Sequence, residues 1–117
     1  MAYMLLIIEP SGQRSTRSEA EGRQLYQRML DFGADLKDRG LLQASQALRS
    51  DREGVRVQMR GGKPSLVDGP FSETKEMVGG FFLVTCESKD DALAIAEACP
   101  AAEWATVEVR ELGPCFM

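Results

Sequence analysis

Two segments of this chain are apolar on both of their alternating faces, and they limit the folds that the sequence can adopt. Residues 3–8 read YMLLII and residues 80–86 read GFFLVTC, and each segment has the length of one strand. Because successive side chains of a strand point to opposite sides of a sheet, both sides of these strands need cover. The sequence therefore predicts a sheet with a packed layer on each face.

Two helices are predicted between the strands. Ser18 with Glu21 forms a capping-box pattern, and a helix follows up to Gly40. Its apolar residues recur at helical spacing: Leu25, Met29, Phe32 and Leu36. A shorter, alanine-rich helix is predicted between Ser88, which is a second N-cap, and Pro100, which stops the helix.

The remaining strands complete the order. Residues 41–50 predict a weak strand, residues 55–60 and 63–67 a hairpin around a glycine pair, and residues 104–112 the last strand. One face of the hairpin is apolar and the other polar, so we expect it near the outside. The order is β-α-β, hairpin, β-α-β, which indicates a single α+β domain over residues 1–117, with a ferredoxin-like antiparallel sheet and two helices on one face.

Two helices can cover only one face of that sheet. A second copy of the chain, packed sheet against sheet about a two-fold axis, is the simplest cover for the other face. On the last strand, the second face is predicted to carry Trp104, Glu108 and Arg110, and polar groups at such an interface need partners or a cavity. We therefore expect a homodimer with a ligand cavity between its two sheets.

The composition excludes several classes of function. The net charge of −4 argues against a nucleic-acid-binding protein, because phosphate binding needs a basic face. No apolar run approaches the roughly 18 residues of a membrane span, and the first residues lack the features of a signal peptide. The chain contains three cysteines, an odd number, which favours reduced thiols and a cytoplasmic location.

The chain has no histidine, so Ser-His-Asp, Cys-His and histidine-ligated metal chemistry are absent, and no cofactor or metal is predicted.

The segment VDGPFSETKEMVGGFF, residues 67–82, admits a structural interpretation. Asp68 can cap its own turn, Gly69 can take a positive φ, and Phe71 can fill the corner of the core. Ser72 can cap one helical turn that carries the charged residues after it. In this interpretation the segment is a rigid corner at the mouth of the dimer cavity.

A functional interpretation accounts for the charges that a corner does not need. Asp68 and Glu73 are candidate catalytic bases, and with Glu76 they can also bind a hard cation. The candidate ligand-binding residues are Arg49, Lys75, Glu76, Glu108 and Arg110. The cations of this set can hold a carboxylate or phenolate. Alternatively, Arg110 pairs with Glu73 or Glu76 and joins the corner to the last strand.

The same residues resemble a known family. The resemblance covers nearly the whole chain, and its motifs are Met4-Leu5-Leu6-Ile7, Asp68-Gly69-Pro70-Phe71 with Glu73-Thr74-Lys75-Glu76, Gly79-Gly80, and Val107-Glu108-Val109-Arg110. The chain resembles bacterial DGPF-domain proteins of the YCII-related family. The resemblance implies a dimeric ferredoxin-like α+β barrel.

For function, the resemblance implies less. Some members of the group are encoded beside extracytoplasmic-function sigma factors, and a wider relative resembles a lyase that removes chloride from chlorinated hydroquinones. A His-Asp mechanism proposed for related proteins does not transfer, because this chain has no histidine.

Three functions therefore remain open. The chain is a cytoplasmic protein that binds or senses a small anionic or aromatic molecule, a lyase or isomerase with a carboxylate base, or a protein-protein module whose partner is the sigma factor.

Overall fold

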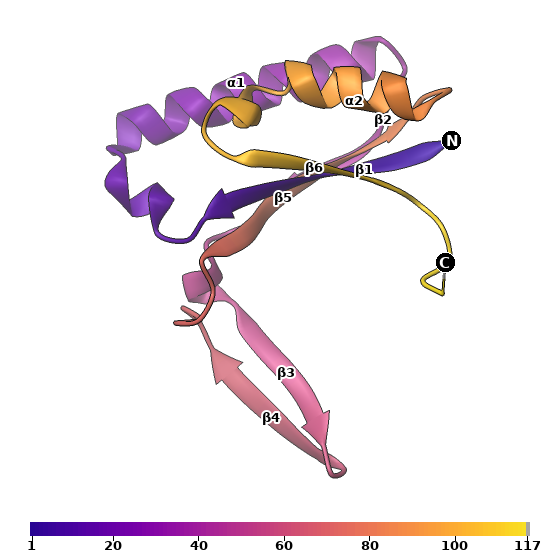
Figure 1. Cartoon of the computed structure of the whole chain (residues 1–117). Coiled ribbons are helices and arrows are strands. Elements are labelled where there is room, and N and C mark those ends of the chain that lie inside the picture. The colour runs from indigo at the N-terminus through magenta and orange to yellow at the C-terminus, as the bar shows by residue number, and fades with distance from the viewer. Residues whose placement is uncertain (117) are drawn as a thin grey trace.

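The computed structural model describes residues 1–116 and has two layers, an antiparallel sheet with two helices on one face, and a hairpin that stands apart (Figure 1). The sheet strands are β1 (Ala2–Pro10), β2 (Leu42–Ala47), β5 (Glu76–Thr85) and β6 (Thr106–Glu111). The helices are α1 (Glu19–Asp38) and α2 (Lys89–Ala98), and the hairpin strands are β3 (Val55–Arg60) and β4 (Lys63–Asp68). Three short 3₁₀ helices are η1 (Gln13–Thr16), η2 (Asp51–Glu53) and η3 (Pro100–Glu103). The predicted α+β class is confirmed.

The sheet has the order β2-β5-β1-β6, and every neighbouring pair of strands is antiparallel. This is the ferredoxin-like order. Leu5 of β1 lies opposite Phe82 of β5 and Val109 of β6, so β1 is an inner strand. The two segments that are apolar on both faces thus occupy the two central positions of the sheet.

The helices cover one face of the sheet and bury the core there. The buried core consists of Tyr3, Leu5, Ile7, Leu36, Phe82, Val84, Cys86, Ala92, Ile95, Ala96, Cys99 and Ala101. The two predicted N-caps are confirmed: the hydroxyl of Ser18 accepts from the Glu21 amide at 3.1 Å, and that of Ser88 accepts from Asp91 at 3.1 Å. These caps fix where each helix begins above the sheet.

The opposite face of the sheet, which we call the open face, is not covered by helices. It carries the half-buried side chains of Met4, Leu6, Ile8, Phe81 and Leu83. The register aligns Met4 with Arg110 and Leu6 with Glu108, so these two charged residues lie on the open face, as the sequence predicts. Trp104 does not. It precedes β6 and lies on the helix side, 5.5 Å below the guanidinium of Arg28, so its predicted place was wrong.

Helix α1 packs closely on the sheet only through its C-terminal half. Its buried residues are Gly33 and Leu36, and a Cβ atom at Gly33 would lie 3.4 Å from the Phe82 ring. In the N-terminal half, Leu25 is half-buried and Tyr26 is exposed. The helix therefore leaves a space between its first turns and the sheet.

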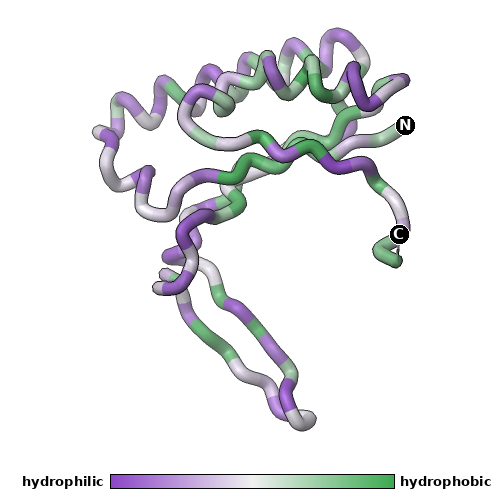
Figure 2. The backbone as a smooth tube through the Cα atoms, in the orientation of Figure 1, coloured by the Kyte–Doolittle hydropathy of each residue, from purple (hydrophilic) through white to green (hydrophobic). Residues whose placement is uncertain are grey.

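The hairpin β3–β4, residues 55–68, forms an arm that extends from the sheet on the side away from the helices (Figure 1). Every residue of both strands is exposed. The predicted outside position is confirmed, but the apolar face is also uncovered, and Figure 2 shows hydrophobic residues along both strands. Within residues 1–116, no helix is both long and apolar enough to cross a membrane.

Candidate functional site

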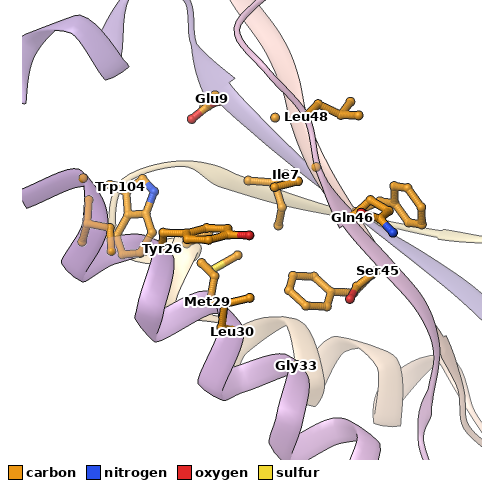
Figure 3. A pocket seen from close by; sticks show the side chains of 18 of the residues that line it. Ile7, Glu9, Tyr26, Met29, Leu30, Gly33, Ser45, Gln46, Leu48 and Trp104 are labelled. Carbon is orange, nitrogen blue, oxygen red and sulfur yellow. The ribbon is translucent and has the colours of Figure 1, made fainter. Parts of the chain in front are cut away.

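A cavity of about 810 Å³ lies between α1 and the sheet, and the helix residues that line it run from Gly22 to Lys37 (Figure 3). Its volume is typical of pockets for small molecules. Ile7 rises from β1 toward the helix, while Tyr26 and Met29 reach from α1 toward the sheet. The body of the cavity is therefore apolar and aromatic, and it lies on the opposite side of the sheet from the predicted cavity between subunits.

One end of this cavity is charged. Glu9 of β1 is only 4% exposed, and its Oε1 lies 2.5 Å from Nη2 of Arg14 in η1. The Arg14 guanidinium donates hydrogen bonds to the carbonyl oxygens of Leu48 at 2.7 Å and of Gly79 at 3.3 Å. Arg14 therefore balances the charge of Glu9, and the same guanidinium holds the carbonyls of Leu48 and Gly79.

The local sequence explains how this pair is accommodated. Glu9 continues the inward alternation of Tyr3, Leu5 and Ile7, so its side chain points to the helix side of the sheet. At Gly79, a Cβ atom would overlap the Glu9 carboxylate, and at Gly80 it would lie 2.8 Å from the backbone oxygen of Gln46. The double glycine makes room for the buried ion pair and for close approach of β2.

A second positive group borders the same end of the cavity. The guanidinium of Arg17 lies 6.0 Å from the centre of the Trp104 ring, and both residues line the cavity. Arg28 approaches the same ring but also hydrogen-bonds to Glu103, and this bond lowers the pKa of the Glu103 carboxyl. No carboxylate within residues 1–116 forms an ion pair with Arg17, so its charge is available to an anion.

The structure places the site residues that were predicted from the sequence in three separate regions. Arg49 lines the cavity, where it pairs with Glu53 at 3.0 Å on the surface. On the open face, Glu108 and Arg110 lie 3.9 Å apart. The alternative in which Arg110 pairs with Glu73 or Glu76 is therefore wrong.

The other candidates surround the base of the arm and do not line the cavity: Asp68, Glu73, Lys75 and Glu76. All of them are exposed, and none makes an ion pair within residues 1–116. Their predicted catalytic and ligand-binding roles stay predictions.

The DGPF corner closes the base of the arm. The amide of Gly69 donates to the carbonyl of Gly54 at 2.8 Å, and a Cβ atom at Gly69 would overlap the Asp51 carbonyl. The guanidinium of Arg56 stacks 3.9 Å above the Phe71 ring. These contacts tie the two ends of the arm together, which accounts for an aromatic and a glycine at these positions.

Four details of the structural interpretation of this corner are wrong. Gly69 does not take a positive φ. A glycine is needed there for another reason, which is the close approach of the chain to η2. The side chain of Asp68 caps nothing among residues 1–116, and Phe71 lies outside the core. Ser72 caps no helix, because turns connect β4 to β5.

Sequence reasoning also missed Glu9, Arg14 and Tyr26. A charged residue at an inward position of an apolar strand was the available signal for Glu9. Among residues 1–116, no three metal-ligating side chains lie together.

The sequence model of the YCII-related domain matches residues 1–115. The chain belongs to the YCII-related family. It is 29% identical, over 114 residues, to an uncharacterized protein of Rhizobium meliloti (strain 1021), and the match covers 96% of this chain and 92% of that protein.

A solved structure has the same fold at a TM-score of 0.56 and 16% identity, over 97% of this chain and 94% of the other. That protein is the 5-chloro-2-hydroxyhydroquinone dehydrochlorinase of Burkholderia phenoliruptrix AC1100, in complex with 2,5-dihydroxybenzoquinone.

Proposed function

We propose that this protein binds a small aromatic compound, carrying a hydroxyl group and an acidic group, in the cavity beneath α1. The observation that carries the proposal is the buried ion pair of Glu9 and Arg14 at the charged end of an otherwise apolar and aromatic cavity. A carboxylate can accept several hydrogen bonds, so a hydroxyl of a ligand is a suitable further donor to Glu9.

The rest of the cavity supports the same class of ligand. Ile7 and Met29 supply apolar surface for a ring, and Tyr26 supplies an aromatic face. At the charged end, Arg17 can bind a carboxylate or phenolate through charge-assisted hydrogen bonds. A protein of the same fold binds a dihydroxybenzoquinone, which resembles such a ligand in having a flat six-membered ring with acidic hydroxyl groups.

Calorimetric titration with hydroquinone, 4-hydroxybenzoate and benzoate tests the proposal. We expect Glu9→Gln to weaken the binding of the two phenols by about tenfold or more, and the binding of benzoate much less. The reason is that only the phenols carry a hydroxyl donor. Arg17→Ala should weaken the binding of the two carboxylates more than the binding of hydroquinone.

The matched controls for this titration are Glu97→Gln on α2 and Arg23→Ala on α1. Both residues are exposed and lie outside the cavity lining. Absence of binding at about 1 mM for all three compounds, or equal effects of Glu9→Gln and Glu97→Gln, contradicts the proposal.

A lyase reaction is the second candidate, and the same carboxylate favours it. In the keto tautomer of the ligand, the carbon that carries the leaving group bears a hydrogen and is tetrahedral. Glu9 would take a proton from a hydroxyl of this tautomer, and the electron pair left behind would form a double bond. The leaving group would depart as an anion with its bonding electrons, and Arg17 would receive it. Release of chloride from 5-chloro-2-hydroxyhydroquinone, lost in Glu9→Gln, is the expected result. A rate equal to that of the buffer alone contradicts this candidate.

We also propose that the chain forms a homodimer through the open face. The apolar side chains on that face lie on the two central strands, and a second sheet is the simplest cover for them. Sedimentation at micromolar concentration should give twice the chain mass. A monomer at about 50 µM contradicts this part of the proposal, with no consequence for ligand binding.

A further inference from the structure

The arm carries an apolar face that no described part of the chain covers. Residues that lie opposite each other in the register of β3 and β4 share one face of this ribbon. One face combines Val55, Val57, Met59, Pro64, Leu66 and Asp68. The other face combines Arg56, Gln58, Arg60, Lys63, Ser65 and Val67. The arm is therefore amphipathic, with its apolar side chains gathered on one side.

Such a ribbon needs a surface to lie on. Val57 is 61% exposed and Leu66, directly opposite it, is 65% exposed. A two-stranded hairpin alone is marginally stable in water, and continuous exposed apolar surface marks an interaction site. The corner at Gly69 and Phe71 closes only the base of the arm, so the strands beyond it depend on another contact.

The position of the arm indicates which body can supply that contact. The arm extends on the side of the sheet away from the helices, which is the side of the open face (Figure 1). Six residues of strand extend about 20 Å, whereas stacked sheets lie about 10 Å apart. An arm of this length reaches past a second sheet that is stacked on the open face.

Charge favours a second copy as the occupant. The arm contains Arg56, Arg60, Lys63 and Asp68, a net charge of +2. Since the whole chain carries −4, the rest of the chain carries −4 − 2 = −6. A second copy therefore offers an acidic body to a basic arm, and opposite charges favour the encounter and the orientation of the two.

We propose that the arm of each subunit lies against the body of the other subunit, with the face of Val57 and Leu66 buried there. The two-fold axis makes the contact reciprocal, so each copy holds its partner and is held by it. This inference rests on the proposed dimer and adds to it a specific role for residues 55–68.

Paired lysine substitutions test the inference on the full chain. Val57→Lys and Leu66→Lys place a charge on the apolar face, and Gln58→Lys and Ser65→Lys place the same charge on the other face, one register position away. Sedimentation equilibrium gives the dissociation constant of the dimer. We expect an increase of about tenfold or more for the first two variants and less than about threefold for the control variants.

Hydrogen exchange on the unchanged protein gives a second measurement. Amides of residues 55–68 should exchange more slowly well above the dissociation constant than well below it, because the partner covers the arm. This result does not depend on whether a variant folds.

The outcomes separate the arm from the dimer. If the dimer forms but all four variants dissociate alike, and arm exchange does not depend on concentration, the role of the arm is refuted and the dimer stands. A wild-type chain that is monomeric at about 50 µM refutes both. Ligand titrations of the same variants are independent of either result.

Discussion

Replacing Arg14 by methionine should destabilise the protein substantially, although Arg14 lies in the short 3₁₀ helix η1. Methionine keeps the apolar length of the side chain and removes its charge and its N–H donors. The variant loses the 2.7 Å bond to the Leu48 carbonyl and leaves the carboxylate of Glu9 buried without its counterion. A hydrogen bond from a charged donor contributes about 1.5–3 kcal/mol, and breaking a fully buried ion pair costs about 3–5 kcal/mol.

These two figures do not simply add at this site. The side chain of Arg14 is 35% exposed, so water can solvate part of the space it leaves and reduce the cost. We therefore expect Arg14→Met to lower the free energy of unfolding by about 2–4 kcal/mol, a large part of the usual total for a domain.

Urea denaturation, followed by circular dichroism and by fluorescence of the single tryptophan, measures this change. The double-mutant cycle with Glu9→Gln isolates the coupling between the two side chains, which we expect at about 1–2 kcal/mol. If Arg14→Met costs less than about 0.5 kcal/mol, or if the two changes add within about 0.3 kcal/mol, the pair does not hold the cavity end together.

Three further predictions concern other parts of the chain. Gly69→Ala should lower the free energy of unfolding, measured by urea denaturation, by about 2 kcal/mol or more. The added Cβ atom would overlap a backbone carbonyl of η2, so the corner must open. A decrease below about 0.5 kcal/mol contradicts this prediction. Hydrogen bonding by Arg28 lowers the pKa of Glu103, so the contribution of this pair is present above the ordinary carboxyl pKa and is lost as pH falls through the lowered value. An NMR titration should show that shift disappear in Arg28→Ala. Cys115 is exposed and should react with a thiol reagent first, whereas burial raises the pKa of Cys99 and slows its reaction.

Much of the fold follows from short-range patterns in the sequence. Alternation that is apolar on both faces predicts the central strands, because only inner strands of a covered sheet need it. Serine N-caps predict where α1 and α2 begin, because the capping bond joins residues three positions apart. Trp104 was misplaced because it was included in β6, whereas the strand begins at Thr106.

The candidate site depends on contacts between distant segments, which no local pattern contains. Arg14 reaches the Leu48 carbonyl 34 residues away and the Gly79 carbonyl 65 residues away, from a segment whose sequence has no periodicity. At the DGPF corner, a local pattern gave the wrong explanation. The turn type was the expected reason for Gly69, whereas this residue is small because η2 passes close to it.

The cavity end is built at a cost to stability, and this cost argues for its use in binding. An apolar pair of similar size at positions 9 and 14 would be neutral or more stable, because burying an ion pair costs desolvation that its attraction only partly offsets. The adjacent Gly79 and Gly80 are also unfavourable within a strand, by roughly 0.5–1 kcal/mol each relative to alanine, and the first of them is needed to fit the Glu9 carboxylate. A structural role alone explains neither the ion pair nor Gly79, since leucine at position 9 and alanine at position 79 would hold β1 and β5 together at least as well. The buried carboxylate of Glu9 is the feature that these costs preserve, and it borders the cavity that a ligand would occupy.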